Sequence, residues 1–299
     1  MSWLRGFLVQ GVYWRQMLRF GVLNIPIWLE PIAIATWSGI FLLWGSGRRG
    51  VMRNLSAILP GSWAVTNFFR AYRVFWNFAW TIADNVRFKE TRVSPDWEFS
   101  GMEHFERLQA ESGGAIILTA HMGNYDLGAH LFAGMSSRQI VMVRAPEHDP
   151  ETQRYEEELR GRTVGESVRV GFSTRSGEFA LDLLHSVRGG DIIAIQGDRA
   201  IPGISIIPTT LFGKRTGVPA GPFALAMTSG VPIYPLFIVR QGRRRYRLVV
   251  REPFHITRTK NRSEAFERGV ARWTGHLEAV IAETWYQWFT FEPYSEELA

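Results

Sequence analysis

The sequence predicts an α/β fold in which a mainly parallel central sheet is flanked by helices and preceded by an N-terminal hydrophobic helical segment. From about residue 96 onward, short apolar runs typical of buried strands alternate with stretches of helical periodicity. A long apolar stretch, residues 23–44, precedes this alternation. We therefore expect an N-terminal segment, residues 1–50, and one domain, residues 51–299, with a helical first part (51–95) and an α/β second part (96–299).

The apolar stretch 23–44 is a candidate membrane segment. It is 22 residues long, long enough to cross a bilayer, and Glu30 is its one charged residue. Glu30 and two prolines lie in its first half, and the remaining residues 32–44 are too few to cross alone. Arg48 and Arg49 follow and favour a cytoplasmic carboxyl side. A single anchor, a half-embedded helix pair and a buried core helix all remain open.

Residues 45–50 match G-x-G-x-x-G, but no acidic residue occurs between Pro31 and Ala83. A dinucleotide site needs a preceding strand and an acid about 20 residues on, so we interpret the glycines as a hinge. Arginines and aromatic residues crowd this acid-free region, which is typical of a surface at a membrane interface. The formal net charge of +6 fits anionic lipid, an acidic carrier protein or nucleic acid. Signatures of nucleic-acid readers are absent, so we expect no nucleic-acid partner.

The elements are expected in the following order. Residues 51–89 predict helices with wide apolar faces, residues 93–99 lead into the α/β part, and residues 102–111 predict a helix. Strands are expected at residues 115–119, 139–143, 168–171, 191–196 and 233–239. Helices are expected at residues 124–134, 150–161, 177–187, 219–228 and 263–289. Residues 237–254, turning at Gln241-Gly242, predict an antiparallel hairpin that completes the sheet.

His121 and Asp126 are the candidate catalytic pair. His121 follows the strand 115–119, at the carboxyl end where α/β proteins place reactive groups. On one continuous helix the two side chains would diverge by about 140°. A backbone break at Gly123-Asn124 lets them meet, and a carboxylate that holds a histidine makes it a general base. The competing interpretation is a structural histidine and an aspartate that caps a helix.

Two other strand ends carry polar residues. Arg144 follows the strand 139–143, and Asp198 and Arg199 follow the strand 191–196. In a parallel sheet these ends meet His121 in one crevice. A surface arginine and a structural Asp–Arg pair are the alternatives.

Two further stretches carry candidate binding residues. Residues 212–217 contain Gly213 but lack the phosphate-loop spacing, and we expect them to be the loop before a helix that starts near Pro219. Residues 243–245, with Arg247 and Arg251, form a dense positive cluster. The cluster is either a solvated hairpin tip or a docking site for an acidic carrier protein or anionic lipid.

The sequence lacks the residues that several kinds of catalysis require. The chain has no cysteine, which excludes a thiol nucleophile and a Cys-ligated metal. G-x-S-x-G and H-E-x-x-H are absent, so a serine elbow and a catalytic metal are unsupported. Direct transfer is therefore favoured over a covalent enzyme intermediate.

The block His121-Met122-Gly123-Asn124-Tyr125-Asp126 resembles the H-x4-D/E block of glycerolipid acyltransferases, most closely the H-[FM]-G-N-[WY]-[ED] form of bacterial lipid A late acyltransferases of the lauroyl and myristoyl transferase type. Other segments agree with that family in order and spacing over residues 48–290. They are Arg48-Arg49, Arg53-Asn54-Leu55, Leu59-Pro60, Val143-Arg144-Ala145-Pro146, Gly197-Asp198-Arg199, Leu211-Phe212-Gly213, Thr216-Gly217, Pro219-Ala220 and residues 228–235.

The resemblance implies a glycerol-3-phosphate acyltransferase-like fold and an O-acyltransferase at the cytoplasmic face of the cell inner membrane. The donor would be acyl carrier protein or acyl-CoA, with no other cofactor, and the acceptor a hydroxyl of a lipid or glycolipid such as a lipid A precursor. It makes His121 the general base and Asp126 its orienting group. The substrate-binding residues that it implies are Gly123, Asn124, Arg144, Asp198, Arg199 and Gly213.

Asp126 and Tyr125 depart from the Glu and Trp that are commoner in those enzymes, which leaves the acceptor open. A phosphatidylinositol mannoside or an ornithine lipid are further candidates. A thioesterase that uses water, and a non-catalytic membrane adaptor with the same fold, are the competing functions.

Overall fold

The computed structural model describes residues 12–128, 131, 138–146, 149–163, 168–173, 177–199 and 203–298. The helices are α2 (Val12–Asn24), α3 (Glu30–Leu42), α4 (Gly45–Ile58), α5 (Ala64–Thr91), α6 (Met102–Ala110), α8 (Pro150–Thr163), α9 (Gly177–Arg188), α10 (Gly221–Ser229), α11 (Arg262–Thr284), and the short 3-10 turns η1 (Trp285–Gln287) and η2 (Glu296–Leu298). The strands are β1 (Asp96–Ser100), β2 (Ala115–Thr119), β3 (Ile140–Arg144), β4 (Val168–Phe172), β5 (Ile192–Gln196), β6 (Ile206–Leu211), β7 (Lys214–Pro219), β8 (Ile233–Gly242) and β9 (Arg245–Val250).

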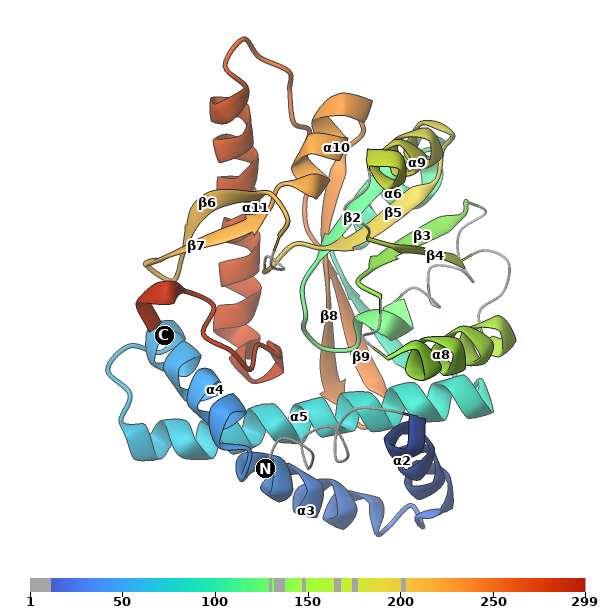
Figure 1. Cartoon of the computed structure of the whole chain (residues 1–299), viewed down its shortest axis with the longest axis vertical. Helices are drawn as coiled ribbons and strands as arrows, with labels where there is room; N and C mark the ends of the chain where they lie inside the picture. Colours follow the sequence, from blue (N-terminus) through green and yellow to red (C-terminus); the bar gives the residue numbers. More distant parts are fainter. Residues whose placement is uncertain are drawn as a thin grey trace.

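Within the described residues, seven strands form one sheet in the order β1-β9-β8-β2-β5-β3-β4 (Figure 1). Strands β8, β2, β5, β3 and β4 are parallel, β9 is antiparallel to β8, and β1 pairs parallel with β9. The predicted mainly parallel sheet is confirmed, and the five predicted strands are β2 to β5 and β8. The predicted hairpin is β8–β9, which turns at Arg243-Arg244 rather than at Gln241-Gly242.

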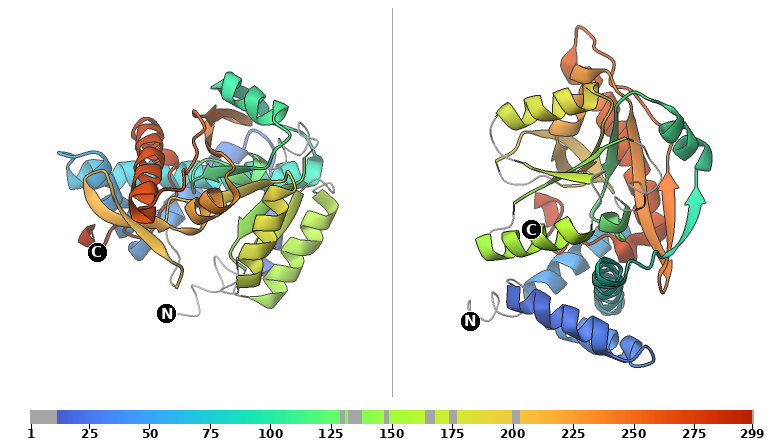
Figure 2. Two further views of the ribbon diagram at one scale, coloured as in Figure 1. Left: turned by 90° about the horizontal axis from the view of Figure 1, so that it is seen from above. Right: turned by 90° about the vertical axis from the view of Figure 1, so that its right-hand side faces the viewer.

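Helices cover both faces of this sheet (Figure 2). All five residues of β2 are buried, as expected for a central parallel strand. On one face Leu118 belongs to a core with Phe223 of α10 and Trp273 of α11. On the other face Ile117 packs in a core with Phe105 of α6. Of the predicted helix 124–134, residues 125–128 and 131 are helical, Asn124 precedes the helix, and residues 129–130 and 132–134 lie outside the described residues.

A layer of N-terminal helices lies along the carboxyl edge of the parallel strands. The long helix α5 crosses beneath β8 and β9, with α2, α3 and α4 packed against it (Figure 1). The apolar stretch 23–44 is not one helix, because α2 ends at Asn24 and α3 begins at Glu30, with a proline in its first turn. In the described part of the chain, no helix combines the length and the apolar character that crossing a membrane requires. Residues 1–11 of the predicted anchor lie outside the described residues.

The predicted hinge at residues 45–50 is wrong, because α4 begins at Gly45. The glycines serve close packing rather than flexibility. A Cβ on Gly50 would lie 2.1 Å from the carbonyl oxygen of Phe291, so only glycine lets α4 approach the C-terminal segment this closely.

The loop predicted at residues 212–217 is also wrong, because these residues form the turn and much of the second strand of the β6–β7 hairpin. Phe212 and Gly213 both have positive φ, 47° and 72°, as a two-residue type I′ turn requires. The carboxylate of Glu278 on α11 accepts a hydrogen bond from the backbone N–H of Phe212. This contact from a distant helix supports a conformation that phenylalanine disfavours, which the local sequence does not reveal.

Glu30 joins the N-terminal helices to the sheet. Its side chain is 6% exposed and pairs with Arg87 of α5 and Arg243 of the β8–β9 turn. Replacing Glu30 with alanine should lower the free energy of unfolding by about 3 kcal/mol, because two arginines lose their buried counter-charge. Urea unfolding measures this loss. Glu103→Ala, at a position 73% exposed, is the control and should change it by less than about 1 kcal/mol; equal effects would disprove the role of Glu30.

Candidate active site

The loop that carries His121 is fixed by the C-terminal segment. The backbone N–H of Gly123 donates to the carbonyl of Gln287 at 3.1 Å, and that of Phe289 donates to the carbonyl of His121 at 2.8 Å. Gly123 has a φ of +53°, and a Cβ there would lie 1.6 Å from the carbonyl oxygen of Ile238. Glycine is therefore required where the chain leaves β2, and His121 is held in one position.

Asp198 is the carboxylate that holds His121. Nδ1 of His121 lies 2.7 Å from Oδ1 of Asp198, whose side chain is fully buried, whereas that of His121 is 22% exposed. The other carboxylate oxygen accepts a hydrogen bond from Nε1 of Trp288 at 2.9 Å. Nε1 of Trp273 donates to the backbone carbonyl of Gly197 at 3.0 Å, which fixes the loop after β5. With Nδ1 occupied, Nε2 is the imidazole nitrogen that remains for chemistry.

The electrostatic environment keeps Asp198 ionised. Burial by itself would raise the pKa of this carboxyl group. The charge and hydrogen bond of His121, the charge of Arg199 and the hydrogen bond of Trp288 outweigh burial, and the pKa falls from 3.8 to about 2. A carboxylate of this kind is suited to stabilise an imidazolium.

Asp126 does not occupy the predicted position on His121. Its carboxylate forms an ion pair with Arg144 and accepts a hydrogen bond from Nδ2 of Asn85 on α5 at 3.0 Å. Asn124 caps the new helix, its Oδ1 lying 3.3 Å from the backbone N of Leu127. Asp126 thus lies in the first helical turn and faces β3 and α5, while His121 stays at the end of β2. The kink was correctly placed, but it separates the two side chains instead of joining them.

The other predicted site residues divide into two groups. Arg144, at the end of β3, and Arg199, after β5, line the same cavity as His121. Asn124 donates through Nδ2 to the carbonyl of Thr81 at 3.2 Å and so ties the loop to α5. Gly213 lies in the β6–β7 turn, and the structure does not bring it to this cavity.

Two cavities meet beside His121. The larger, about 960 Å³, runs from His121 over the ends of β3 and β5 to α9 and α10, and we call it the histidine groove. The smaller, about 400 Å³, lies between α2, α3 and α5, and we call it the helix pocket. Tyr125 and Arg144 line both. The ring of Tyr125 packs edge-on against His121, with 5.9 Å between centroids.

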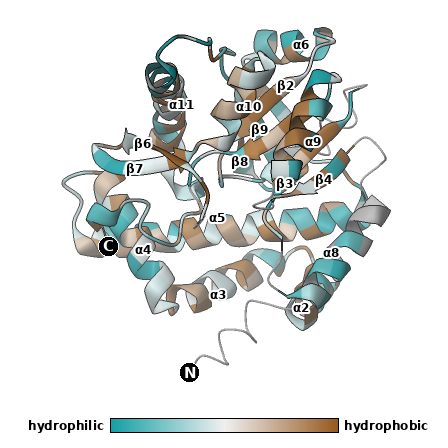
Figure 3. Cartoon of the chain, turned by 45° about the horizontal axis from the view of Figure 1, so that its top comes forward, coloured by the Kyte–Doolittle hydropathy of each residue, from teal (hydrophilic) through white to brown (hydrophobic). Residues whose placement is uncertain are grey.

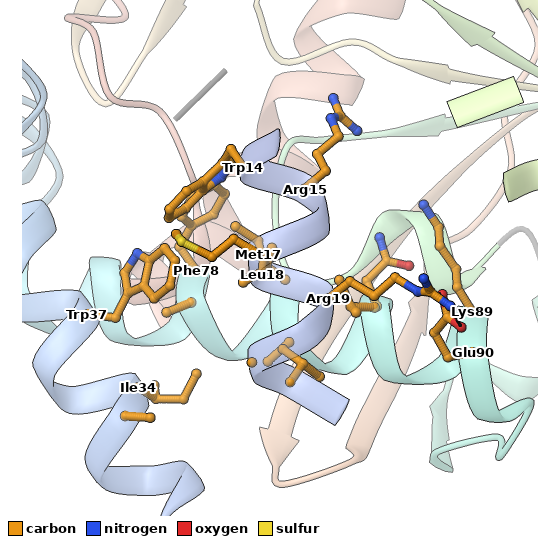
Figure 4. Close-up of a pocket in the computed structure, with 18 of the residues that line it drawn as sticks. Trp14, Arg15, Met17, Leu18, Arg19, Ile34, Trp37, Phe78, Lys89 and Glu90 are labelled. Carbon is orange, nitrogen blue, oxygen red and sulfur yellow. Dashed lines mark hydrogen bonds and ion pairs between the residues drawn. The ribbon is translucent and has the colours of Figure 1, made fainter. Parts of the chain in front are cut away.

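The helix pocket is apolar at one end and charged at the other. Figure 4 shows Trp14, Trp37 and Phe78 grouped at one end, and Arg19 with Glu90 at the other. The ring centroids of Trp14 and Trp37 are 4.5 Å apart, and Arg19 and Glu90 form an ion pair. No sequence pattern predicts this pocket, because its walls come from three helices that lack a common motif.

The positive cluster at the β8–β9 hairpin is largely neutralised. Arg243 pairs with Glu30, and Arg245 and Arg247 approach Glu98 at 3.8 and 3.3 Å. Of the two interpretations of this cluster, a solvated hairpin tip and a docking site, the exposed Arg245 and Arg247 fit the first, whereas Arg243 joins the hairpin turn to α3.

Comparison with protein families decides the assignment. The family model for bacterial lipid A biosynthesis acyltransferases matches residues 27–294, nearly the whole chain. The chain belongs to this family. The protein is therefore an acyltransferase that uses an acyl donor and a lipid acceptor. In its sheet His121, Asp198 and Arg144 lie at the ends of the neighbouring strands β2, β5 and β3. A search of curated proteins gave no match. Within the described residues of this acyltransferase, His, Asp and Glu side chains form no group of three suited to a metal ion.

Proposed function

We propose that this lipid A family acyltransferase moves a fatty acyl chain from an acyl thioester to a hydroxyl of a membrane glycolipid, with His121 as general base. The observation that carries the proposal is the buried Asp198 on Nδ1 of His121, which leaves Nε2 at the wall of a large groove. An imidazole held in this way can accept a proton during the reaction.

The chemistry requires two proton transfers. Nε2 of His121 removes the acceptor hydroxyl proton as the oxygen attacks the thioester carbonyl carbon. The tetrahedral oxyanion then collapses, the C–S bond breaks, and the departing thiolate takes the proton from Nε2, giving an ester and a free thiol. Arg144 and Arg199 place positive charge in the same groove and support stabilisation of the oxyanion. Asp126 would act by holding Arg144 rather than His121.

The two cavities offer separate places for the two substrates. The apolar walls of the helix pocket suit the acyl chain of the donor, and its lining reaches Tyr125 and Arg144 beside His121. The wider histidine groove, with its cations, suits the reacting hydroxyl of the acceptor and the polar arm of the donor.

Acceptor-dependent ester formation tests this function. Purified protein with acyl carrier protein carrying a fatty acyl thioester should release thiol and form an acylated lipid A precursor, at a rate that falls sharply without the acceptor. Parallel reactions with acyl-CoA and with an ornithine lipid compare the other substrates. Mass spectrometry separates the outcomes, because free fatty acid at the same rate with and without acceptor would mean a thioesterase and contradict the proposal.

A membrane-facing surface is supported by the exposed apolar side chains. Of 19 large apolar side chains exposed in the described chain, 14 lie between residues 13 and 69, on or beside α2, α3, α4 and the start of α5. Figure 3 shows these helices together on one side of the sheet. The exposed side chains include Trp28, Leu43 and Trp63, which are 71%, 79% and 81% exposed. This region contains arginines, and its one acidic residue, Glu30, is buried. Exposed aromatic and aliphatic residues in such a region are suited to the headgroup boundary of a bilayer.

Replacing Trp28, Leu43 and Trp63 together with serine should reduce co-sedimentation with anionic phospholipid vesicles at least tenfold, because each side chain loses apolar contact with the bilayer. The control is Val93→Ser with Met102→Ser, which removes two exposed apolar side chains outside this region. Equal vesicle binding by the triple variant and the wild type would show that this surface is not the one that meets the membrane.

A further inference from the structure

A third cavity, about 450 Å³, lies at the sheet edge between α5, the end of β8 and η1, and none of its residues lines the histidine groove. Three aromatic side chains line it, Tyr72, Trp76 and Tyr286, with two arginines, Arg73 and Arg240. We call it the aromatic–arginine cavity. Aromatic rings beside planar cationic donors are suited to a ring-shaped ligand that carries negative charge.

Arg240 is a buried cation with unused hydrogen-bonding capacity. Its side chain is 10% exposed, and its Nε is buried without a hydrogen-bond partner in the described chain. Asp84 forms an ion pair with Arg240, its Oδ2 lying 3.7 Å from that nitrogen but beyond hydrogen-bond distance, and the Trp80 ring centroid lies 4.9 Å from the guanidinium carbon. Asn77 is a marginal acceptor at 3.5 Å. Burial lowers the pKa of Arg240, and Asp84 offsets this only in part. An anion in the cavity would add negative charge to that of Asp84 and accept hydrogen bonds from this guanidinium.

Arg73 adds a second positive charge at the rim. Its guanidinium lies 3.9 Å from the ring centroid of Tyr286 and 5.4 Å from that of Trp285. Among the described residues no carboxylate lies within ion-pair distance of Arg73. The amide side chains of Asn77 and Gln241 also line the cavity and can bond to hydroxyl groups. Charge, stacking surface and amide groups together match a phosphorylated sugar.

The location connects this cavity to both the membrane-facing surface and His121. Phe69, one turn before Arg73 on α5, is 68% exposed and belongs to the proposed membrane-facing surface. On the other side, the side-chain amide of Gln287 accepts a hydrogen bond from the backbone N–H of Arg240 and donates one to the backbone carbonyl of Arg240. The backbone carbonyl of Gln287 accepts a hydrogen bond from the backbone N–H of Gly123. The segment 285–289 therefore has the cavity on one side and the His121 loop on the other.

We propose that the aromatic–arginine cavity binds a phosphorylated sugar, the chemistry of a glycolipid head group at the membrane surface. The role of this cavity in holding a glycolipid head group rests on the proposed function. Binding of the sugar phosphate itself does not depend on acyl transfer. Bound there, the ligand would contact the strand end that Gln287 ties to the catalytic loop.

Calorimetric titration of the full chain in detergent, without acyl donor, tests the site. Glucosamine 1-phosphate should bind more tightly than inorganic phosphate or neutral glucosamine-containing disaccharide, and Arg73→Gln should weaken it at least tenfold. Arg70→Gln is the matched control. Arg70 lies one turn earlier on α5, 5.8 Å from the ring centroid of Trp285, and does not line the cavity. The control should change the affinity less than twofold.

A second variant and a second ligand source make the result decisive. Tyr286→Leu removes a ring from the cavity wall and should weaken the sugar phosphate but not inorganic phosphate. Vesicles carrying a phosphorylated glycolipid show whether the lipid-linked sugar binds through the same arginine. Equal loss in Arg73→Gln and Arg70→Gln, binding of phosphate as tight as of the sugar phosphate, or no binding of the sugar phosphate would each overturn the proposal. Failure of acyl transfer with normal binding here would contradict only the proposed function.

Discussion

Replacing His121 with alanine should lower kcat/KM for acyl transfer by about two to four orders of magnitude, the usual effect of removing a general base. The acceptor hydroxyl would lose the group that takes its proton as it attacks the thioester. The loss should fall on kcat, because the cavities that hold the two substrates remain. Initial rates of ester formation with acyl carrier protein and a lipid A precursor measure it.

Two further variants keep this prediction falsifiable. His121→Ala leaves the buried carboxylate of Asp198 without its main partner, so the variant could lose stability as well as activity. His121→Asn retains a side-chain N–H near that carboxylate but offers no base, and it should be folded and equally inactive. His104→Ala, at a histidine with a similar exposure of 26%, should retain full activity. Wild-type rates in a folded His121→Asn variant would disprove the role of His121 as general base.

The fold was predictable where burial is continuous along the sequence. Strand β2 is an apolar run buried along its whole length, and β5 is an apolar run buried at its start, so their positions follow from the residues themselves. The location of His121 and Asp198 at one edge of the sheet also followed from topology, because parallel strands bring their carboxyl ends together. The β6–β7 hairpin did not, because a Phe-Gly turn lacks the usual turn residues and depends on Glu278, which lies 66 residues away.

The partner of His121 was not predictable from spacing. Asp126 is five residues away in the sequence and was the natural choice, whereas Asp198 is 77 residues away. Which carboxylate reaches Nδ1 depends on where the helix begins after Asn124 and on Trp288 near the C-terminus, neither of which forms a local pattern with His121. The helix pocket was missed for the same reason, because its apolar walls look like ordinary core positions of α2, α3 and α5.

Replacing Asp198 with asparagine should lower kcat by about two to four orders of magnitude with little change in KM. The amide keeps the shape of the side chain but removes the negative charge that stabilises the imidazolium. The acid limb of the pH–rate profile should consequently move to lower pH.

The stability of the wild-type protein should fall at acid pH, because the folded pKa of Asp198, about 2, lies below its ordinary value of 3.8. The stability that the carboxylate contributes should be complete above about pH 4 and lost as the pH falls toward 2.

Asp126→Asn is the variant that separates the two carboxylates, because both changes remove one charge from the same edge of the sheet. Asp126 pairs with Arg144, so its loss should raise KM by releasing that arginine, and the acid limb of the pH–rate profile should stay where it is in the wild type. Full pH–rate profiles of both variants measure the difference. If Asp126→Asn moved the acid limb and Asp198→Asn did not, Asp126 rather than Asp198 would be the carboxylate that acts on His121. The contact between His121 and Asp198 would then be structural, and the reaction would need another geometry than the one described. We expect the reverse, because a carboxylate 2.7 Å from Nδ1 acts on the imidazolium far more strongly than one neutralised by an arginine.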